Sequence, residues 1–304
     1  MYTITARYWG GLGNALFEIA AAITYSYKLD RPFAFEHYPA LPNLDNYSVA
    51  SLGLDPAEYT AALREFSEEE IQNGAIFPET HVKLTGFYQK YKLFEPFKDR
   101  IFDVMGIPNI REDIFAKISA NCSGSELFAK KDREIKISLH IRRGDYEQLQ
   151  CYFLLLNQFY YKNALLKLVN KLDTGSYDKI RVICFYEKKS KIPANSIVDA
   201  LKTDADLLAY PIEYQHFNDL VGCDVSDIEE MAAMSHCENH IIANSTYSWW
   251  SAYINPSPTK IVCYPDEYFN HQLYYLSNEG LQVEGWISIP AWNPLELRCG
   301  CWKR

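Results

Sequence analysis

The sequence predicts an α/β fold with a doubly wound parallel sheet. From residue 135 onward, short apolar runs with strand character alternate with stretches of helical length and spacing. A further unit of strand, glycine turn and helix opens the chain, and 304 residues give a prior of about two domains. Such alternation is typical of parallel sheets covered by helices. We therefore expect two domains, residues 1–130 and 131–304.

The first half is predicted to contain strands over 2–9, 31–37 and 82–89 and a buried helix over 15–29. The turn Gly10-Gly11-Leu12-Gly13-Asn14 joins the first strand to this helix, and its glycines let a ligand approach the backbone. It lacks the third glycine of the dinucleotide-binding pattern, because Leu16 stands there. The run from Ser67 to Glu70 has the form of a capping box. Residues 108–131 are polar and interrupted, which indicates a link between the halves.

The second half is predicted to alternate regularly between strands and helices. We expect strands over 135–141, 179–186, 211–217, 240–243 and 260–264. Helices are expected over 158–172 and 226–237, and a helical stretch ends at Leu208. In the first of these strands apolar and polar residues alternate, so we expect it to bury one face.

Two adjacent arginines, Arg142 and Arg143, follow the strand 135–141. Neighbouring cations at the end of a buried strand repel each other and resist desolvation, so an anionic partner is expected to compensate them. A diphosphate would be such a partner, because ligands of open α/β sheets gather beyond the carboxyl ends of the strands. The alternative, an arginine pair on a solvated loop, remains open for this stretch taken alone.

A second polar turn, Asn244-Ser245-Thr246-Tyr247-Ser248, follows the strand 240–243. Small hydroxyl side chains at the start of a helix place O–H and N–H donors together, which suits a phosphate or a sugar. Plain helix capping explains the same pattern. Capping also explains most of the charge in the run 226–230, which contains Asp227.

Composition excludes several classes of function. The net charge of -9 argues against a general nucleic-acid binder, which needs a surplus of clustered lysine and arginine. No stretch approaches the roughly 20 apolar residues of a membrane span, and a strand within the first few residues leaves no room for a signal peptide. We expect a soluble, cytoplasmic protein. The cysteines show no C-x-x-C pair, so a structural zinc site is not expected.

The sequence contains few motifs that could bind a divalent metal ion. Asp204 and Asp206 have the Asp-x-Asp spacing, but they fall within a predicted helix rather than at the end of a strand. We therefore expect no metal and no other cofactor. The charge of a diphosphate leaving group would then have to be neutralised by the arginines.

Four segments together resemble the α-1,2-fucosyltransferases of glycosyltransferase family 11. They occur in the order of the family and extend over about residues 10 to 255: Gly10-Gly11-Leu12-Gly13-Asn14-Ala15-Leu16-Phe17, Leu84-Thr85-Gly86-Phe87-Tyr88-Gln89, His140-Ile141-Arg142-Arg143-Gly144-Asp145-Tyr146, and Ile241-Ile242-Ala243-Asn244-Ser245-Thr246-Tyr247-Ser248-Trp249-Trp250.

The resemblance implies a GT-B fold, in which two Rossmann-like domains face a central cleft. It implies an amino-terminal domain that binds mostly the acceptor, a galactose-terminated glycan, and a carboxyl-terminal domain that binds GDP-fucose. It also implies inversion at the anomeric carbon without a metal ion. Arg142 and Arg143 resemble the clamp on the diphosphate, with Arg142 as the essential one.

Further donor contacts follow by position from the same resemblance. His140 and Asp227 resemble residues that contact the guanosine, whereas Asn244, Ser245 and Ser248 resemble other contacts to the donor. The residues of the glycine turn that shape the cleft are Gly11, Gly13 and Asn14.

A carboxylate should accept the proton of the attacking hydroxyl, and Asp145 and Glu147 are both candidates for this general base. The choice between them stays open. Two alternatives to a galactoside α-1,2-fucosyltransferase remain: a fucosyltransferase with another acceptor or linkage, and a catalytically silent protein that binds a sugar nucleotide or carbohydrate.

Overall fold

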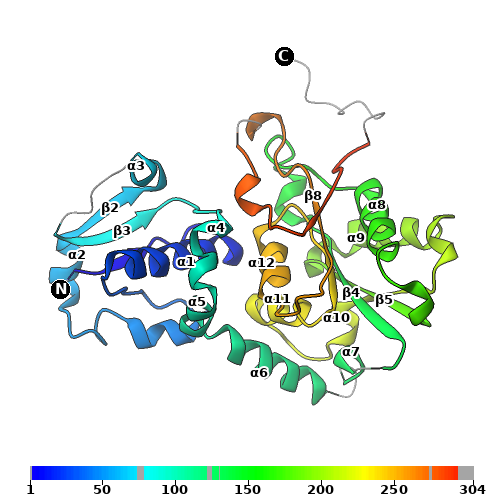
Figure 1. Cartoon of the computed structure of the whole chain (residues 1–304), viewed down its shortest axis with the longest axis horizontal. Coiled ribbons are helices and arrows are strands. Elements are labelled where there is room, and N and C mark those ends of the chain that lie inside the picture. The colour runs from blue at the N-terminus through cyan, green and yellow to red at the C-terminus, as the bar shows by residue number, and fades with distance from the viewer. Residues whose placement is uncertain (1, 74–78, 122–124, 130, 274–275, 294–304) are drawn as a thin grey trace. The chain divides into compact units, whose positions relative to one another are not determined.

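The computed structural model describes residues 2–73, 79–121, 125–129, 131–273 and 276–293 (Figure 1). The chain forms two compact units. The first comprises residues 1–112, 226–229 and 279–281, and the second comprises 113–225, 230–278 and 282–304. Both contain a parallel sheet with helices, which confirms the predicted α/β class. The assignment of acceptor and donor binding to residues 1–130 and 131–304 stays a prediction.

The first unit is built on a three-stranded parallel sheet with the order β1-β3-β2. Its strands are β1 (Ile4–Ala6), β2 (Leu63–Ser67) and β3 (His81–Thr85). The long helix α1 (Leu12–Leu29) begins directly after the glycine turn. The strand expected over 31–37 is wrong, because this segment forms only single bridges, from Phe33 to Ile4 and from Phe35 to Ser48.

The other α-helices that precede β4 are α2 (Pro56–Ala62), α3 (Glu68–Gln72), α4 (Tyr91–Phe94), α5 (Lys98–Met105), α6 (Ile107–Ser119) and α7 (Ser125–Phe128). Most of them are short, whereas α6 has 13 residues and was not predicted from the sequence. The predicted link 108–131 is therefore largely helical. Ile107, Ile114 and Ile118 are buried at helical spacing and form an apolar stripe beneath a polar surface. The capping box at Ser67 is confirmed.

The second unit is built on a six-stranded parallel sheet with the order β6-β5-β4-β7-β8-β9, as predicted for a doubly wound fold. The strands are β4 (Glu134–His140), β5 (Lys179–Phe185), β6 (Ile212–His216), β7 (Asn239–Ile241), β8 (Val262–Pro265) and β9 (Ile287–Ile289), of which β9 was not predicted. The helices are α8 (Gln158–Val169), α9 (Lys191–Lys202), α10 (Phe217–Leu220), α11 (Asp227–Met234) and α12 (Thr246–Ile254).

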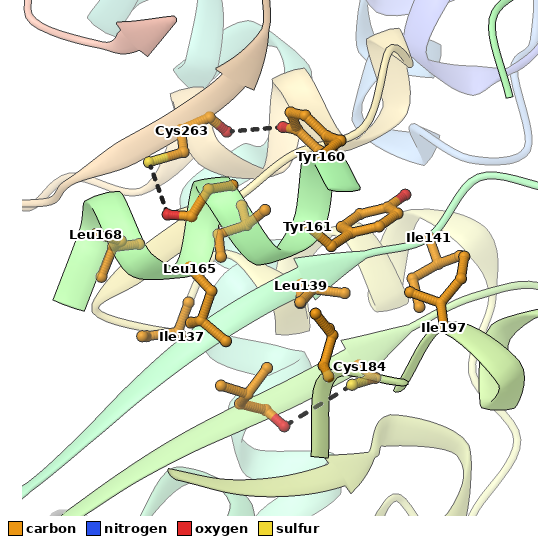
Figure 2. Packing of buried hydrophobic residues seen from close by; sticks show 14 of the residues in the cluster. Ile137, Leu139, Ile141, Tyr160, Tyr161, Leu165, Leu168, Cys184, Ile197 and Cys263 are labelled. Atoms are coloured by element: carbon orange, nitrogen blue, oxygen red, sulfur yellow. Dashed lines mark hydrogen bonds between the residues drawn. The ribbon is translucent and has the colours of Figure 1, made fainter. Parts of the chain in front are cut away.

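Strand β4 is buried on both faces, so the expectation that it buries one face is wrong. Figure 2 shows one of these faces, where α8 packs across the sheet and places Leu165 and Leu168 near Ile137 of β4. The polar residues of β4 are accommodated by partners. Lys136 donates from Nζ to the carbonyl of Ala129 at 2.9 Å. Parallel strands of α/β proteins are ordinarily covered on both sides in this way.

A tyrosine of α8 also reaches the backbone next to β7 and β8. The hydroxyl of Tyr160 donates to the carbonyl oxygen of Ile242 at 2.5 Å, and Tyr160 and Cys263 lie close together (Figure 2). This holds the backbone just after β7 in a fixed position. Within the described part of the chain, no helix has both the length and the apolar character that a membrane span requires.

Candidate functional site

The order of the strands reverses between β4 and β7. From β4 the chain adds β5 and β6 on one side, and it then places β7, β8 and β9 on the other side. Because β4 and β7 are parallel neighbours, the segments that follow them meet at the same edge of the sheet. These segments are the two that the sequence analysis selected, Arg142-Arg143 and Asn244–Ser248. Such a reversal is the usual ligand site of an open α/β sheet.

Side chains join the two segments directly. The hydroxyl of Tyr146 donates to the backbone carbonyl of Asn244 at 3.0 Å. The ring of His140 lies against the ring of Tyr247, with a centroid separation of 5.6 Å. The structure thus brings the arginine segment and the serine-rich turn into one local arrangement within the second unit.

Arg142 is compensated by carboxylates of its own unit. Its Nη2 donates to Asp145 Oδ1 at 2.6 Å, and its Nη1 donates to Glu187 Oε1 at 2.8 Å. The guanidinium carbon also lies 5.0 Å from the centroid of the Tyr146 ring. The two carboxylates and the ring therefore hold the guanidinium in a defined orientation.

Glu187 is the site residue that the sequence analysis missed. His140 pairs with Phe185 in the parallel register of β4 and β5, and Arg142 and Glu187 each follow two positions later. Equal offsets from paired residues place both side chains at one level of the sheet edge. The backbone at Gly144 is part of the same arrangement, because its φ is +51° and a Cβ there would lie 2.6 Å from Glu187 Oε2. The register of β4 and β5 could have identified Glu187 from the sequence only if these two strands had been known to be neighbours.

Arg143 differs from Arg142 in its environment. It is half-buried, and no residue in the described part of the chain forms an ion pair with it. Its Nε is buried and has no hydrogen-bond partner among the described residues. A half-buried guanidinium without a compensating carboxylate favours an anionic ligand.

His140 is a neutral imidazole near neutral pH. Burial, and then the positive charge of Arg142, lower its pKa to about 3. Its Nδ1 is buried and has no hydrogen-bond partner within the described ranges. His140 can therefore offer a hydrogen bond to a ligand but no positive charge.

Asn244 and Ser248 hold the turn itself. The amide nitrogen of Asn244 donates to the carbonyls of Leu154 and Tyr268, each at 2.9 Å, and its Oδ1 is buried without a partner among described residues. The hydroxyl of Ser248 donates to the carbonyl of Ser245 at 3.3 Å. Ser245 directly precedes α12 as its N-cap. The donor contacts expected of these residues stay predictions, and their structural role is to fix the backbone.

The two candidate bases lie on the turn that follows the arginines. Asp145 and Glu147 are both exposed, and Asp145 already pairs with Arg142. The ion pair with Arg142 makes the Asp145 carboxylate a weaker proton acceptor, whereas Glu147 forms no such pair with Arg142. Both assignments stay predictions.

The remaining predicted residues belong to the first unit. Gly11 is the N-cap of α1, and Gly13 and Asn14 lie in its first turn. Asn14 Oδ1 accepts a hydrogen bond from Gln89 Nε2 at 3.1 Å. Asp227, the exposed first residue of α11, is grouped with this unit as well. A common cleft with Arg142 stays a prediction for all four.

The residues Asp204 and Asp206 lie in the turn after α9, so their expected position in a helix is wrong. Lys162 Nζ lies 2.8 Å from a carboxylate oxygen of each aspartate. An ammonium group thus stands between the two carboxylates. Among the residues that the structure describes, no cluster of three or more His, Cys, Asp or Glu side chains could hold a metal ion.

Comparison with known proteins adds independent findings. The family model described as "Glycosyl transferase family 11" matches residues 200–289, which include β7 and the turn that follows it. The resemblance to glycosyltransferase family 11 is confirmed.

Two proteins of Escherichia coli are similar to this chain along much of its length. The O-antigen biosynthesis glycosyltransferase WbnK is 29% identical over 211 residues, which make up 68% of this chain and 60% of that protein. The match thus spans less than two thirds of WbnK. An alpha-1,2-colitosyltransferase is 24% identical over 95% of this chain and 99% of its own length.

Solved structures similar to this chain include two fucosyltransferases. A mutant of FUT1 from Arabidopsis thaliana in complex with GDP has a TM-score of 0.48 at 12% identity and covers 86% of this chain and 70% of its own. NodZ from Bradyrhizobium has a TM-score of 0.46 at 12% identity, with coverages of 84% and 95%.

Proposed function

We propose that this protein transfers fucose from GDP-fucose to the 2-hydroxyl of a galactose residue in a glycan acceptor. The observation that carries the proposal is the pair Arg142 and Arg143 at the reversal of strand order, beside the turn that follows β7. A nucleoside diphosphate matches two guanidinium groups in charge and in hydrogen-bonding geometry. The family match supports a glycosyl donor. The name of the colitosyltransferase relative supports a 1,2 linkage.

The proposed reaction is a single displacement with inversion. The acceptor oxygen forms a bond to C1 of fucose while the bond from C1 to the phosphate oxygen breaks, and the electron pair leaves with GDP. The transition state has oxocarbenium character, as in glycoside hydrolysis. The hydroxyl proton passes to a carboxylate, for which Asp145 and Glu147 are the candidates.

The two arginines act on the leaving group without a metal ion in this proposal. Arg143 has an unpartnered Nε for a phosphate oxygen, and Arg142 exchanges a carboxylate for one. Each charge-assisted hydrogen bond contributes about 1.5–3 kcal/mol. Only the part that strengthens as the bond to C1 breaks accelerates the reaction.

The test is an assay of GDP-fucose with a panel of galactose-terminated acceptors, followed by linkage analysis of the product. We expect transfer and a fucose linked to the 2-position. Transfer to another position or to another sugar would replace the acceptor part of the proposal. Tight binding of GDP without transfer to any member of the panel would favour the silent binding protein instead.

A second candidate donor follows from the name of the same relative. An enzyme named for colitose indicates that proteins similar to this one use a deoxysugar other than fucose. The same assay with GDP-colitose distinguishes the two. A higher kcat/KM with GDP-colitose than with GDP-fucose would assign colitose as the natural donor.

A further inference from the structure

Two exposed aromatic side chains lie at the carboxyl edge of the three-stranded sheet. Trp9 is 54% exposed and Phe87 is 42% exposed. They follow the neighbouring strands β1 and β3, and their ring centroids are 6.0 Å apart. Two large apolar side chains exposed side by side mark a candidate ligand-binding surface.

The backbone of Trp9 is fixed from beneath by a buried acid. The Trp9 amide donates to Glu18 Oε2 at 2.8 Å, and Glu18, on α1, is only 1% exposed. The guanidinium carbon of Arg7 lies 4.6 Å from the centroid of the Trp9 ring. The ring is therefore held in place while much of it stays accessible.

The turn that exposes Phe87 is likewise held by a carboxylate. Tyr88 has a φ of +48°, a left-handed conformation that is costly for a tyrosine. Its amide donates to Glu68 Oε2 at 2.9 Å, and its ring is buried. This conformation persists because its surroundings fix it. The result is that Tyr88 points into the core while Phe87 faces outward.

Polar groups follow the two aromatic residues closely along the chain. The hydrogen bond from Gln89 to Asn14 ties the turn after β3 to the glycine turn. At Gly11, the position that a Cβ would take has no atom within 4 Å, so the backbone there is open to a ligand. Amide groups, a guanidinium and two exposed rings are the combination that a neutral sugar needs, with its C–H face on the aromatics and its hydroxyls on the polar groups.

We propose that Trp9 and Phe87 form the platform on which the galactose of the acceptor stacks. The axial 4-hydroxyl of galactose leaves one face of its ring lined by C–H groups, which fits an aromatic platform. This inference rests on the proposed function, because it names the residues that bind the acceptor of that reaction. It assigns acceptor recognition to the first unit without using the arginines.

The experiment compares Trp9→Ala and Phe87→Ala with the unmodified protein. The acceptor is the member of the galactose-terminated panel that the unmodified protein uses best. We expect the KM for this acceptor to rise about tenfold in each variant, with the Kd for GDP within about twofold of the unmodified protein. Trp9→Phe should restore most of the loss, because it keeps an aromatic face. Thermal unfolding verifies that each variant is folded.

Tyr2→Ala is the matched control. Tyr2 is 40% exposed and stands just before β1, at the opposite edge of the same sheet. Its removal should leave the KM for the acceptor unchanged. An unchanged acceptor KM in folded Trp9→Ala and Phe87→Ala, or a raised Kd for GDP in its place, overturns the platform while the proposed function stands. Absence of transfer by the unmodified protein overturns the proposed function itself.

Discussion

The buried acid Glu18 makes the stability of this protein depend on pH in a defined direction. Burial raises the pKa of Glu18 from an ordinary value of 4.5 to about 8, although the Trp9 amide and the charge of Arg7 act in the opposite sense. In the folded protein the carboxyl therefore keeps its proton at pH values where the unfolded chain has lost it. The free energy of unfolding must fall as the pH rises from about 4.5 to about 8.

The size of the effect follows from the two pKa values. Their difference corresponds to at most about 5 kcal/mol between the protonated and the ionised acid. Local relaxation around an ionised Glu18 lowers this figure, so we expect about half of it. Glutamine has the same shape, carries no charge, and its side-chain oxygen can still accept the hydrogen bond from Trp9.

The measurement is urea unfolding of the unmodified protein and of Glu18→Gln at several pH values between 4 and 9. The two free energies of unfolding should lie close together at the acid end. The variant should become the more stable protein by about 2–3 kcal/mol at the alkaline end. Glu69→Gln, at an exposed glutamate of α3, is the control and should show no such divergence. Curves for Glu18→Gln that stay parallel to those of the unmodified protein would refute a protonated buried acid.

Three further predictions concern the arginine site. Arg142→Ala should lower the transfer rate about 100-fold or more while thermal unfolding still shows a folded protein, and near-normal turnover would remove Arg142 from the clamp. Gly144→Ala should raise the Kd for GDP several-fold, because the methyl group must displace the Glu187 carboxylate and the backbone there has a φ of +51°; an unchanged Kd would argue against this arrangement. Transfer should persist in excess EDTA, and a complete loss that added Mg²⁺ restores would direct attention to Asp204 and Asp206.

The sequence was sufficient for the parts of the fold that carry regular patterns. Strand β4 and its arginines, the glycine turn before α1 and the turn after β7 were all located correctly. Each of these segments combines a run of apolar residues with residues typical of turns. Both features can be recognised from neighbouring positions in the sequence alone. The parallel order also follows from the alternation of strands and helices.

What the sequence could not provide depends on distant partners. Arg181 is 2% exposed in the middle of β5, where its Nη1 donates to Glu134 of β4 at 3.0 Å and its Nε donates to Gln215 of β6 at 2.9 Å. In the sequence of one strand, a charged residue such as Arg181 indicates a face exposed to solvent. Only the neighbouring strands show that its charge and its hydrogen-bond donors have partners in the interior. Strand β2 was missed for a related reason, because none of its five residues is buried and they show no apolar alternation.

The ion pairs of Arg142 have a consequence for turnover. Under the proposed function, a guanidinium that already pairs with Asp145 and Glu187 would bind a diphosphate by exchanging one anion for another. Such an exchange yields less net free energy than the capture of an anion by a bare cation, and it makes affinity less sensitive to ionic strength. If the proposed reaction takes place, the same carboxylates are in place to pair with the guanidinium again when GDP departs. Under the proposed function, these ion pairs would therefore favour release of the product nucleotide as well as limit the affinity for the donor.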